Sequence, residues 1–207
     1  MKRILTAVMM LSLAAAAALG APEASSSQPL LWCGLDYSMV KMIGALDFRQ
    51  PEKIFPSMPA EWNALFMKEV LPKLESMAKS VRTDIKAVAD RNDTASEKQI
   101  EHEDGTADEK VKPSHITEAN IADAVRSYKL KTDQGLGLVF IMDRMVKAQE
   151  TACMYVVFFD VASRKVVHSE RLCERAGGIG FRNYWFRPVK TVVDKLPRIY
   201  KNVKAGK

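Results

Sequence analysis

The sequence predicts an α+β protein, a two-layer sandwich in which helices cover one face of a mixed, mostly antiparallel, five-stranded sheet. Three observations support this prediction. Strand-like segments and helical patterns follow one another in the order β-α-β-α-β-β-β-α. Three of the strand-like segments are separated by spacers too short for a crossover helix, which is typical of an antiparallel meander. Two long segments carry apolar residues at helical spacing and can therefore cover a sheet.

Residues 1–20 have the organisation of a secretory signal peptide. Lys2 and Arg3 precede an uncharged run, 5–19, and small residues stand at its end. A positive region, an apolar region and a small-residue cleavage site are the marks of such a peptide. An uncleaved anchor is the alternative, but a spanning helix needs about 20 strongly apolar residues. We therefore expect export to the periplasm of a Gram-negative bacterium, with 21–29 as a flexible leader.

The domain itself is expected to span residues 30–200 and to begin with a strand. Segment 30–44 has apolar residues at both parities, which predicts a central strand buried on both faces. Segment 60–81 carries apolar residues at steps of three and four, which predicts a helix with one apolar stripe. Pro72 is expected to end or kink this helix near Leu71, or to start a second one.

The middle of the domain interrupts this hydrophobic pattern. Segment 83–89 is a strand candidate, and segment 92–112 is acidic with almost no apolar residue. A segment that cannot bury apolar surface cannot offset its ordering entropy, so 92–112 is predicted to be a mobile acidic loop. It marks either a functional loop or a boundary between two halves. A single domain is preferred, because about 70 residues before the loop would bury too little surface alone.

The second half of the domain predicts a helix, the meander and a closing helix. Thr117 is the expected N-cap of the first helix. The meander strands are expected at 136–147, 152–161 and 165–173. The closing helix is expected at 181–200, where Pro188 predicts a kink or a late start. The last residues, 201–207, are predicted to be a frayed basic tail.

Three cysteines exclude a disulfide-dense scaffold. If the last hairpin turns about Ser163, Cys153 lies opposite Cys173 at a distance that permits a disulfide. Export favours oxidation, but a register slip of one residue would separate the two side chains. A disulfide and two buried free thiols therefore both stay open. Cys33 is expected to be buried in the first strand.

Composition and charge limit the classes of partner. The 207 residues are 47% hydrophobic and 27% charged, which is typical of a globular protein. Removal of residues 1–20 takes away Lys2 and Arg3 and lowers the formal net charge from +6 to +4. This charge is too small to predict a nucleic-acid-binding face. No later segment is long and apolar enough to span a membrane, so none is expected in the mature chain.

No catalytic or cofactor motif is present in the sequence. It contains no GxSxG, Walker loop, GxGxxG or HExxH pattern. The histidines, His102, His115 and His168, are far apart, and the acidic residues around His102 fit a calcium loop only in part. No metal or cofactor is therefore expected, and a non-enzymatic role is favoured over an enzymatic one.

Polar residues at two places are the candidate binding residues. Asp36 and Ser38 share one face of an apolar strand, and a buried Asp must be paired. Lys41, Asn63, Arg144 and Arg182 are considered as its partners, and a structural ion pair is favoured over a catalytic carboxylate. The second place is the glycine-rich turn before the last helix. Free N–H groups there, with Arg182, suit an anion, although a tight turn alone explains the glycines. The candidates are Asp36, Ser38, Lys41, Asn63, Gly178, Gly180, Arg182, Asn183, Tyr184 and Trp185.

Four segments form a recognisable set: GLDYS with KMIG within 34–44, WN at 62–63, FFDVASRKV at 158–166 and GGIGFRNYW at 177–185. Together they resemble an uncharacterised family of exported periplasmic proteins of Gram-negative bacteria, over most of the mature chain. The resemblance implies no activity and no catalytic residue, and the acidic stretch is an insertion relative to it. The order of elements around Asp160 is also similar to that of periplasmic α/β domains of envelope assembly machines, a likeness of fold alone.

The expected function is that of an exported, envelope-associated binding domain. Its partner would be another envelope protein or a small anionic ligand. The alternative is a periplasmic hydrolase in which Asp36 acts as base, assisted by Ser38 or His168. A third hypothesis is a redox protein that uses Cys153 and Cys173.

Overall fold

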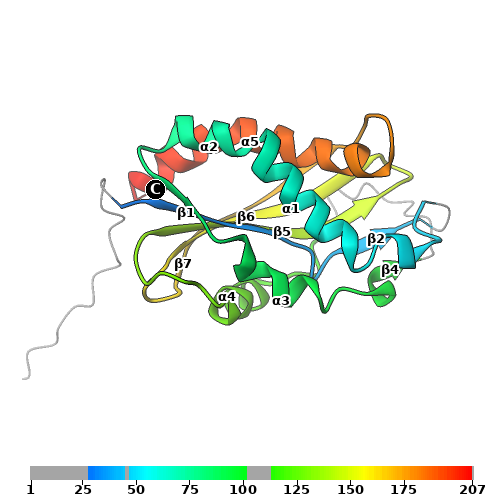
Figure 1. Cartoon of the computed structure of the whole chain (residues 1–207), viewed down its shortest axis with the longest axis horizontal. Helices are drawn as coiled ribbons and strands as arrows, with labels where there is room; N and C mark the ends of the chain where they lie inside the picture. Colours follow the sequence, from blue (N-terminus) through cyan, green and yellow to red (C-terminus); the bar gives the residue numbers. More distant parts are fainter. Residues whose placement is uncertain (1–27, 45–46, 102–112, 207) are drawn as a thin grey trace, which may run out of the picture.

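One sheet passes through the middle of the molecule, with helices on both sides of it (Figure 1). The computed structural model describes residues 28–44, 47–101 and 113–206. These residues contribute seven strands: β1 (Leu30–Asp36), β2 (Lys41–Ile43), β3 (Val81–Thr83), β4 (Ile100–Glu101), β5 (Leu136–Val146), β6 (Thr151–Asp160) and β7 (Val166–Arg175). The order β3-β1-β5-β2-β4 is parallel throughout, and β6 and then β7 continue from β5 in antiparallel pairing.

Helices cover both faces of this sheet. The upper layer in Figure 1 contains α1 (Ser57–Glu69), α2 (Leu71–Met77) and α5 (Phe181–Lys204), and the lower layer contains α3 (Ala89–Asn92) and α4 (Glu118–Ser127). Short 3-10 helices are η1 (Pro51–Lys53), η2 (Ile85–Val88) and η3 (Glu97–Gln99). The core forms two hydrophobic clusters accordingly, one on each face of the sheet. None of the helices in the described ranges is long and apolar enough to cross a membrane.

The predicted two-layer, mostly antiparallel fold is wrong, because the chain is α/β with five parallel strands. The antiparallel meander β5-β6-β7 does form. However, β1 pairs in parallel with β3 and with β5, which are far away in the sequence. Such pairings need helical crossovers, and α1 with α2, and later α4, supply them. The crossovers place helices on both faces, which the two-layer prediction did not allow.

The predicted strand 30–44 is divided into two strands, β1 and β2. Both of them pair with the same edge of β5. Asp36 is level with Ile141 and Lys41 is level with Arg144. From the first of these pairings to the second, the segment that joins β1 to β2 advances five residues, from Asp36 to Lys41, whereas β5 advances only three. Residues 37–40 therefore loop out of the sheet. The predicted burial of both faces is correct, since every residue of β1 is buried.

Two of the predicted helices have different boundaries in the structure. One is divided near Pro72, and the other continues further toward the end of the chain. Pro72 starts the second helix, α2, which is one of the outcomes expected for it. Pro188 lies inside α5, which begins at Phe181 and continues to Lys204. Residues 201–204 of the predicted frayed tail are therefore helical. Because proline has no N–H, Pro188 leaves the carbonyl of Tyr184 without a helical donor, and Gly177 N–H donates to it at 3.1 Å.

Residues 92–101 of the predicted acidic loop contain short regular elements. Asn92 ends α3, Ser96 and Gln99 form a capping box around η3, and β4 pairs with β2. Residues 102–112 of that loop lie outside the described residues, as do the predicted signal peptide and residues 21–27 of the leader. The predicted strand 83–89 is instead the end of β3 followed by η2.

Candidate functional site

Asp36 is fully buried at the carboxyl end of β1 and is the centre of a hydrogen-bond network. Its carboxylate accepts from Arg91 Nε at 2.8 Å, from the Tyr128 hydroxyl at 2.7 Å and from the N–H of Ser38 at 2.9 Å. Arg91 also donates from Nη2 to the Ser38 hydroxyl at 2.7 Å. Burial, together with the charge of Asp36, raises the pKa of Tyr128. The network joins β1 to α3 and to the end of α4.

This network replaces the partners that the sequence suggested for Asp36. Arg91 and Tyr128 provide the pairing, whereas Lys41 forms an ion pair with Glu101 and Arg144 pairs with Asp143. These three hydrogen bonds occupy three of the roughly four acceptor sites of the buried carboxylate. The geometry therefore favours the structural role of Asp36.

The predicted hydrolase pairing of Asp36 with His168 is not formed, because the two residues lie on opposite faces of the sheet. His168 packs beside Phe158, which in turn contacts Tyr200 of α5. Asp36 contacts α3 and the end of α4 on the other face. Ser38 is close to Asp36, but Arg91 binds both of them. Of the cavities described in this part of the chain, none is lined by Asp36, Ser38 and His168 together.

Three side-chain amides hold the break between β1 and β2. Asn63 of α1 accepts from Leu35 N–H at 2.8 Å and donates to Leu35 O at 3.0 Å. Asn92 accepts from Tyr37 N–H at 2.7 Å, and Gln99 donates to Ser38 O at 2.6 Å. The backbone groups that leave the sheet at the break are thus satisfied by side chains, as buried polar groups require. Asn63 is therefore a structural residue.

The glycine turn before α5 opens into a cavity of about 420 Å³, which we call the α5 cavity. Gly178 and Gly180 both have a positive φ, and Gly180 caps α5 without a side-chain hydrogen bond. The first N–H groups of a helix have no acceptor within it. The residues that line the cavity are Asp47, Arg49, Gln50, Lys147, Gly178, Gly180, Phe181, Tyr184 and Trp185.

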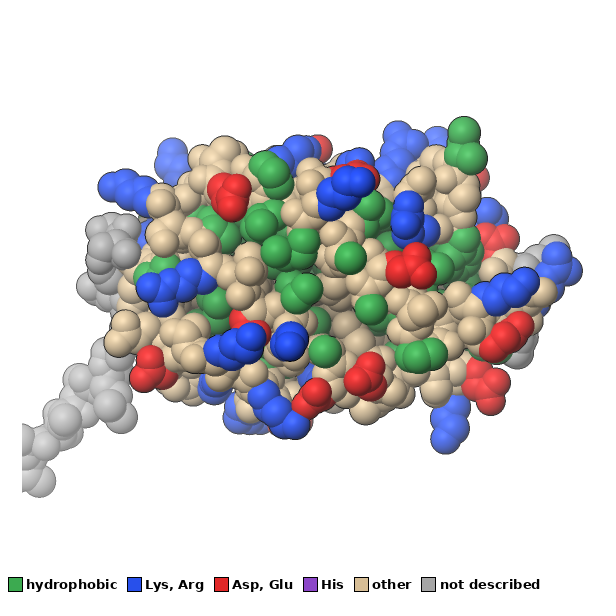
Figure 2. Space-filling view, viewed as in Figure 1, with side chains coloured by type: hydrophobic (Ala, Val, Ile, Leu, Met, Phe, Trp, Pro, Cys, Tyr) green, Lys and Arg blue, Asp and Glu red, His purple; other side chains and the backbone are tan. Residues whose placement is uncertain are grey.

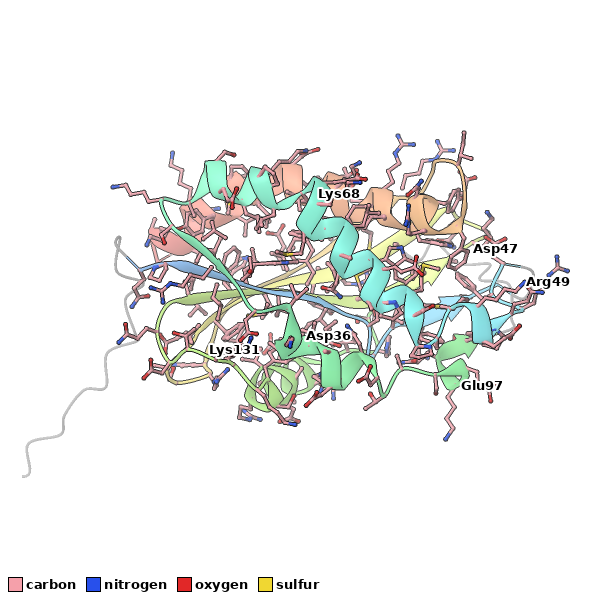
Figure 3. The ribbon with its side chains drawn as sticks, viewed as in Figure 1. Asp36, Asp47, Arg49, Lys68, Glu97 and Lys131 are labelled. Atoms are coloured by element: carbon pink, nitrogen blue, oxygen red, sulfur yellow. A yellow bond between two sulfur atoms is a disulfide. The ribbon has the colours of Figure 1, made fainter. Side chains whose placement is uncertain are left out.

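The α5 cavity includes only some of the predicted binding residues. Gly178, Gly180, Tyr184 and Trp185 line it. Arg182 points elsewhere and lies 4.0 Å from Glu61. Asn183 lines a separate hollow with Arg187 and Asp194. Figure 3 shows Asp36 near the middle of the molecule, whereas Asp47 and Arg49, which line the α5 cavity, lie at one end. The predicted residues around Asp36 and those in the α5 cavity therefore do not form a single site.

Two cations line the α5 cavity, Lys147 and Arg49, and neither was predicted as a site residue from the sequence. Lys147 Nζ lies 3.0 Å from Asp47 and 4.2 Å from the centre of the Tyr184 ring. Partial burial acts to lower the pKa of Lys147, but the hydrogen bond and charge of Asp47 outweigh it and raise that pKa. Arg49 is exposed at the rim and has no ion-pair partner among the described residues. The position of Lys147 directly after β5 was the available signal, since strand ends often carry site residues.

Trp185, which lines the α5 cavity, carries an unpaired donor. Trp185 is only 1% exposed, and its indole N–H is buried without a hydrogen-bond partner among the described residues. Buried N–H groups without an acceptor are rare in folded proteins. Aromatic neighbours hold Trp185 in place, with Phe48 at 5.4 Å between ring centres. Trp62 fixes the first turn of α5 by donating from its indole nitrogen to Arg182 O at 2.9 Å.

A second buried carboxylate, Asp143, anchors the segment before α4. It accepts from Arg171 Nε at 2.7 Å and from Ser114 Oγ at 2.9 Å, and His115 Nδ1 lies 3.0 Å away. Burial acts to raise the pKa of Asp143, but His115 and the cations Arg144 and Arg171 outweigh it and lower that pKa to about 2. The signal in the sequence was the charged pair 143–144 inside an otherwise apolar strand.

The environments of the three cysteines indicate structural roles. Cys153 and Cys173 form a disulfide between β6 and β7, where they are directly opposite each other. Cys33 is a buried free thiol, and burial raises its pKa to about 12. A thiol with such a pKa is a poor nucleophile, because the thiolate is the reactive form.

Comparisons with known proteins return no match for this chain. No family model matches it, no curated protein matches it, and no solved structure matches it. The resemblance to a family of exported proteins therefore stays a prediction from the sequence.

Proposed function

We propose that this protein is an exported, envelope-associated binding domain that holds a small anionic ligand in the α5 cavity. The ligand class is a carboxylate or a phosphate. The observation that carries the proposal is the buried, unpartnered indole N–H of Trp185, a residue that lines the cavity together with Arg49 and Lys147. An acceptor oxygen on a ligand would satisfy this donor.

The α5 N-terminus supports an anion rather than a neutral ligand. A long helix carries a partial positive charge at its N-terminus, and α5 has 24 residues. Its free N–H groups and the glycine turn form the kind of cradle that binds anions. Asp47 is the one acidic residue of the lining, and Lys147 neutralises it.

Calorimetry with inorganic phosphate and with citrate tests this proposal. We expect saturable binding of at least one of the two anions. The substitution Trp185→Phe removes the N–H donor and keeps an aromatic ring, and a lost hydrogen bond of about 1 kcal/mol would weaken binding about fivefold. Arg49→Gln should weaken it further by removing a charge.

Lys68→Gln is the matched control, because Lys68 is a cation of α1 away from the cavity (Figure 3). It should leave the affinity unchanged. Binding that does not saturate with either anion would overturn the proposal. Equal affinities for the parent protein, Arg49→Gln and Trp185→Phe would overturn it as well.

Export is a separate part of the proposal and needs its own test. It is supported by the charged, apolar and small-residue pattern of residues 1–20. After expression in a Gram-negative host, we expect the protein in the periplasmic fraction, with a mature N-terminus at Ala21. A full-length chain in the cytoplasm would contradict it.

A further inference from the structure

One edge of the sheet is open along a long strand. β7 has ten residues and pairs only with β6 among the strands that the structure describes. An edge strand presents unpaired N–H and C=O groups, which can pair with the backbone of another chain. A β-bulge opposite Phe158 and Phe159 leaves Val167 outside the ladder, and Val167 is 37% exposed. The open edge thus offers both backbone groups and an apolar side chain.

A groove of about 550 Å³ lies between the start of β7 and α4. The two elements are neighbours at the lower left of Figure 1. From α4, the groove is lined by Glu118, Ala122 and Arg126, which are four residues apart and share one helix face. Ala122 is the smallest of the three and leaves space at the centre. From the β7 side, Val166 and Val167 contribute apolar wall.

The groove carries more positive than negative charge. Arg126, Arg164 and Lys165 line it together with one acidic residue, Glu118. Nη1 of Arg164 is buried and has no hydrogen-bond partner among the described residues. A buried guanidinium N–H without an acceptor costs free energy. A carboxylate is the acceptor that matches guanidinium geometry best.

From these observations we propose that the groove between α4 and β7 binds an extended peptide segment of a partner protein that bears a carboxylate. The peptide backbone would pair with the open edge of β7 in the manner of an added strand. An apolar side chain would rest on Val167 and Ala122, and a carboxylate would reach Arg164. This surface is distinct from the α5 cavity, and the proposal does not depend on the anionic ligand there.

A selection from a library of random ten-residue peptides with free carboxyl ends tests this proposal, with binding then measured by fluorescence anisotropy. We expect the selected peptides to be enriched in acidic residues or to depend on their terminal carboxylate. Arg164→Gln should weaken their binding at least tenfold. Ala122→Trp fills the groove and should abolish binding.

Matched variants separate this effect from a loss of folding. Ala60→Trp, at an exposed position of α1, and Lys68→Gln should leave peptide binding unchanged. All variants should retain phosphate or citrate binding if the α5 cavity is a site, so failure of one proposal is distinguishable from failure of the other.

Three outcomes would overturn the proposal. The first is no enrichment of any peptide. The second is selected peptides that bind the Ala122→Trp variant as tightly as the parent protein. The third is a concentration-dependent dimer, seen by sedimentation and lost in Ala122→Trp, since a second copy would then be the occupant.

Discussion

The side-chain amide of Asn63 pairs with both backbone polar groups of Leu35, accepting from its N–H at 2.8 Å and donating to its C=O at 3.0 Å. Asn63 also donates to Pro59 O at 2.9 Å within its own helix. Its position in α1 thus fixes the helix against β1 just before the strand leaves the sheet. The amide takes the place that a neighbouring strand would otherwise occupy.

We expect Asn63→Ala to lower the free energy of unfolding by about 1–3 kcal/mol. The substitution leaves the N–H of Leu35 buried without a partner, which costs about that much, whereas Leu35 O keeps its hydrogen bond from Asn92 Nδ2 at 2.9 Å. Urea denaturation measures the change. Asn202→Ala, at an exposed position of α5, is the control and should change stability by less than about 0.5 kcal/mol. A loss below about 1 kcal/mol for Asn63→Ala would contradict this account of the contact.

Gly34 and Asn63 should be energetically coupled. Gly34 has a φ of +113°, and a Cβ there would lie 2.7 Å from Asn63 Oδ1 and 2.8 Å from Val88 Cγ2. Gly34→Ala is therefore expected to destabilise the protein by at least about 2 kcal/mol through strain and overpacking. The double variant, which combines Gly34→Ala with Asn63→Ala, should lose less stability than the sum of the losses of the two single variants. Strict additivity in urea denaturation would show that the predicted clash is absent.

Stability should fall in acid because of Asp143. Its pKa is lowered to about 2 from an ordinary value of 3.8, so its ionised form stabilises the folded state by about 2 kcal/mol at neutral pH. This contribution is fully present above about pH 5 and is lost as the pH falls through 4 towards 2. Unfolding free energies from urea titrations at several pH values measure the slope.

The variant Asp143→Asn should have a smaller slope between pH 5 and pH 2. It should also be less stable at pH 7 by about 3–5 kcal/mol, because Arg144 and Arg171 lose their buried counter-charge. Asp133→Asn, at an exposed position, should keep the slope of the parent protein. Equal slopes for the parent protein and Asp143→Asn would remove Asp143 from the explanation.

Thiol titration should distinguish the three cysteines. The folded protein should show no reactive thiol at pH 8, since Cys33 is buried and its pKa is raised to about 12. Unfolding without reductant should expose one thiol, and reduction should then release the two of Cys153 and Cys173. Replacing both of these by serine should cost about 3 kcal/mol, given the 20-residue separation. Three thiols in the unreduced, unfolded chain would mean that no disulfide forms.

Local patterns in the sequence predict the elements of this fold better than they predict the sheet. The meander follows from short spacers, and the N-cap Thr117 and the start of the closing helix at Phe181 follow from local signals. The parallel pairings do not, because β1 meets β3 and β5 only after helical crossovers. The apolar residues at both parities of segment 30–44 are typical of strands in parallel sheets, but they do not show which strands are its neighbours.

The candidate site was predictable only where its residues are close in the sequence. The glycine turn and Trp185 belong to one segment and were both found. Arg49 and Lys147 reach the same cavity from other parts of the chain. Arg91, the partner of Asp36, comes from a helix 55 residues away. Such contacts are set by the tertiary fold, which the predicted two-layer sandwich did not describe.

Pro188 has an effect that extends beyond the shape of α5. Because it lacks an N–H, the carbonyl of Tyr184 is reserved for Gly177. A residue with an N–H at position 188 would compete with Gly177 for the carbonyl of Tyr184. The hydrogen bond that joins the loop 177–180 to α5 would then be weakened. A residue that breaks helices elsewhere thus tethers the loop at the cavity entrance, without itself lining the cavity.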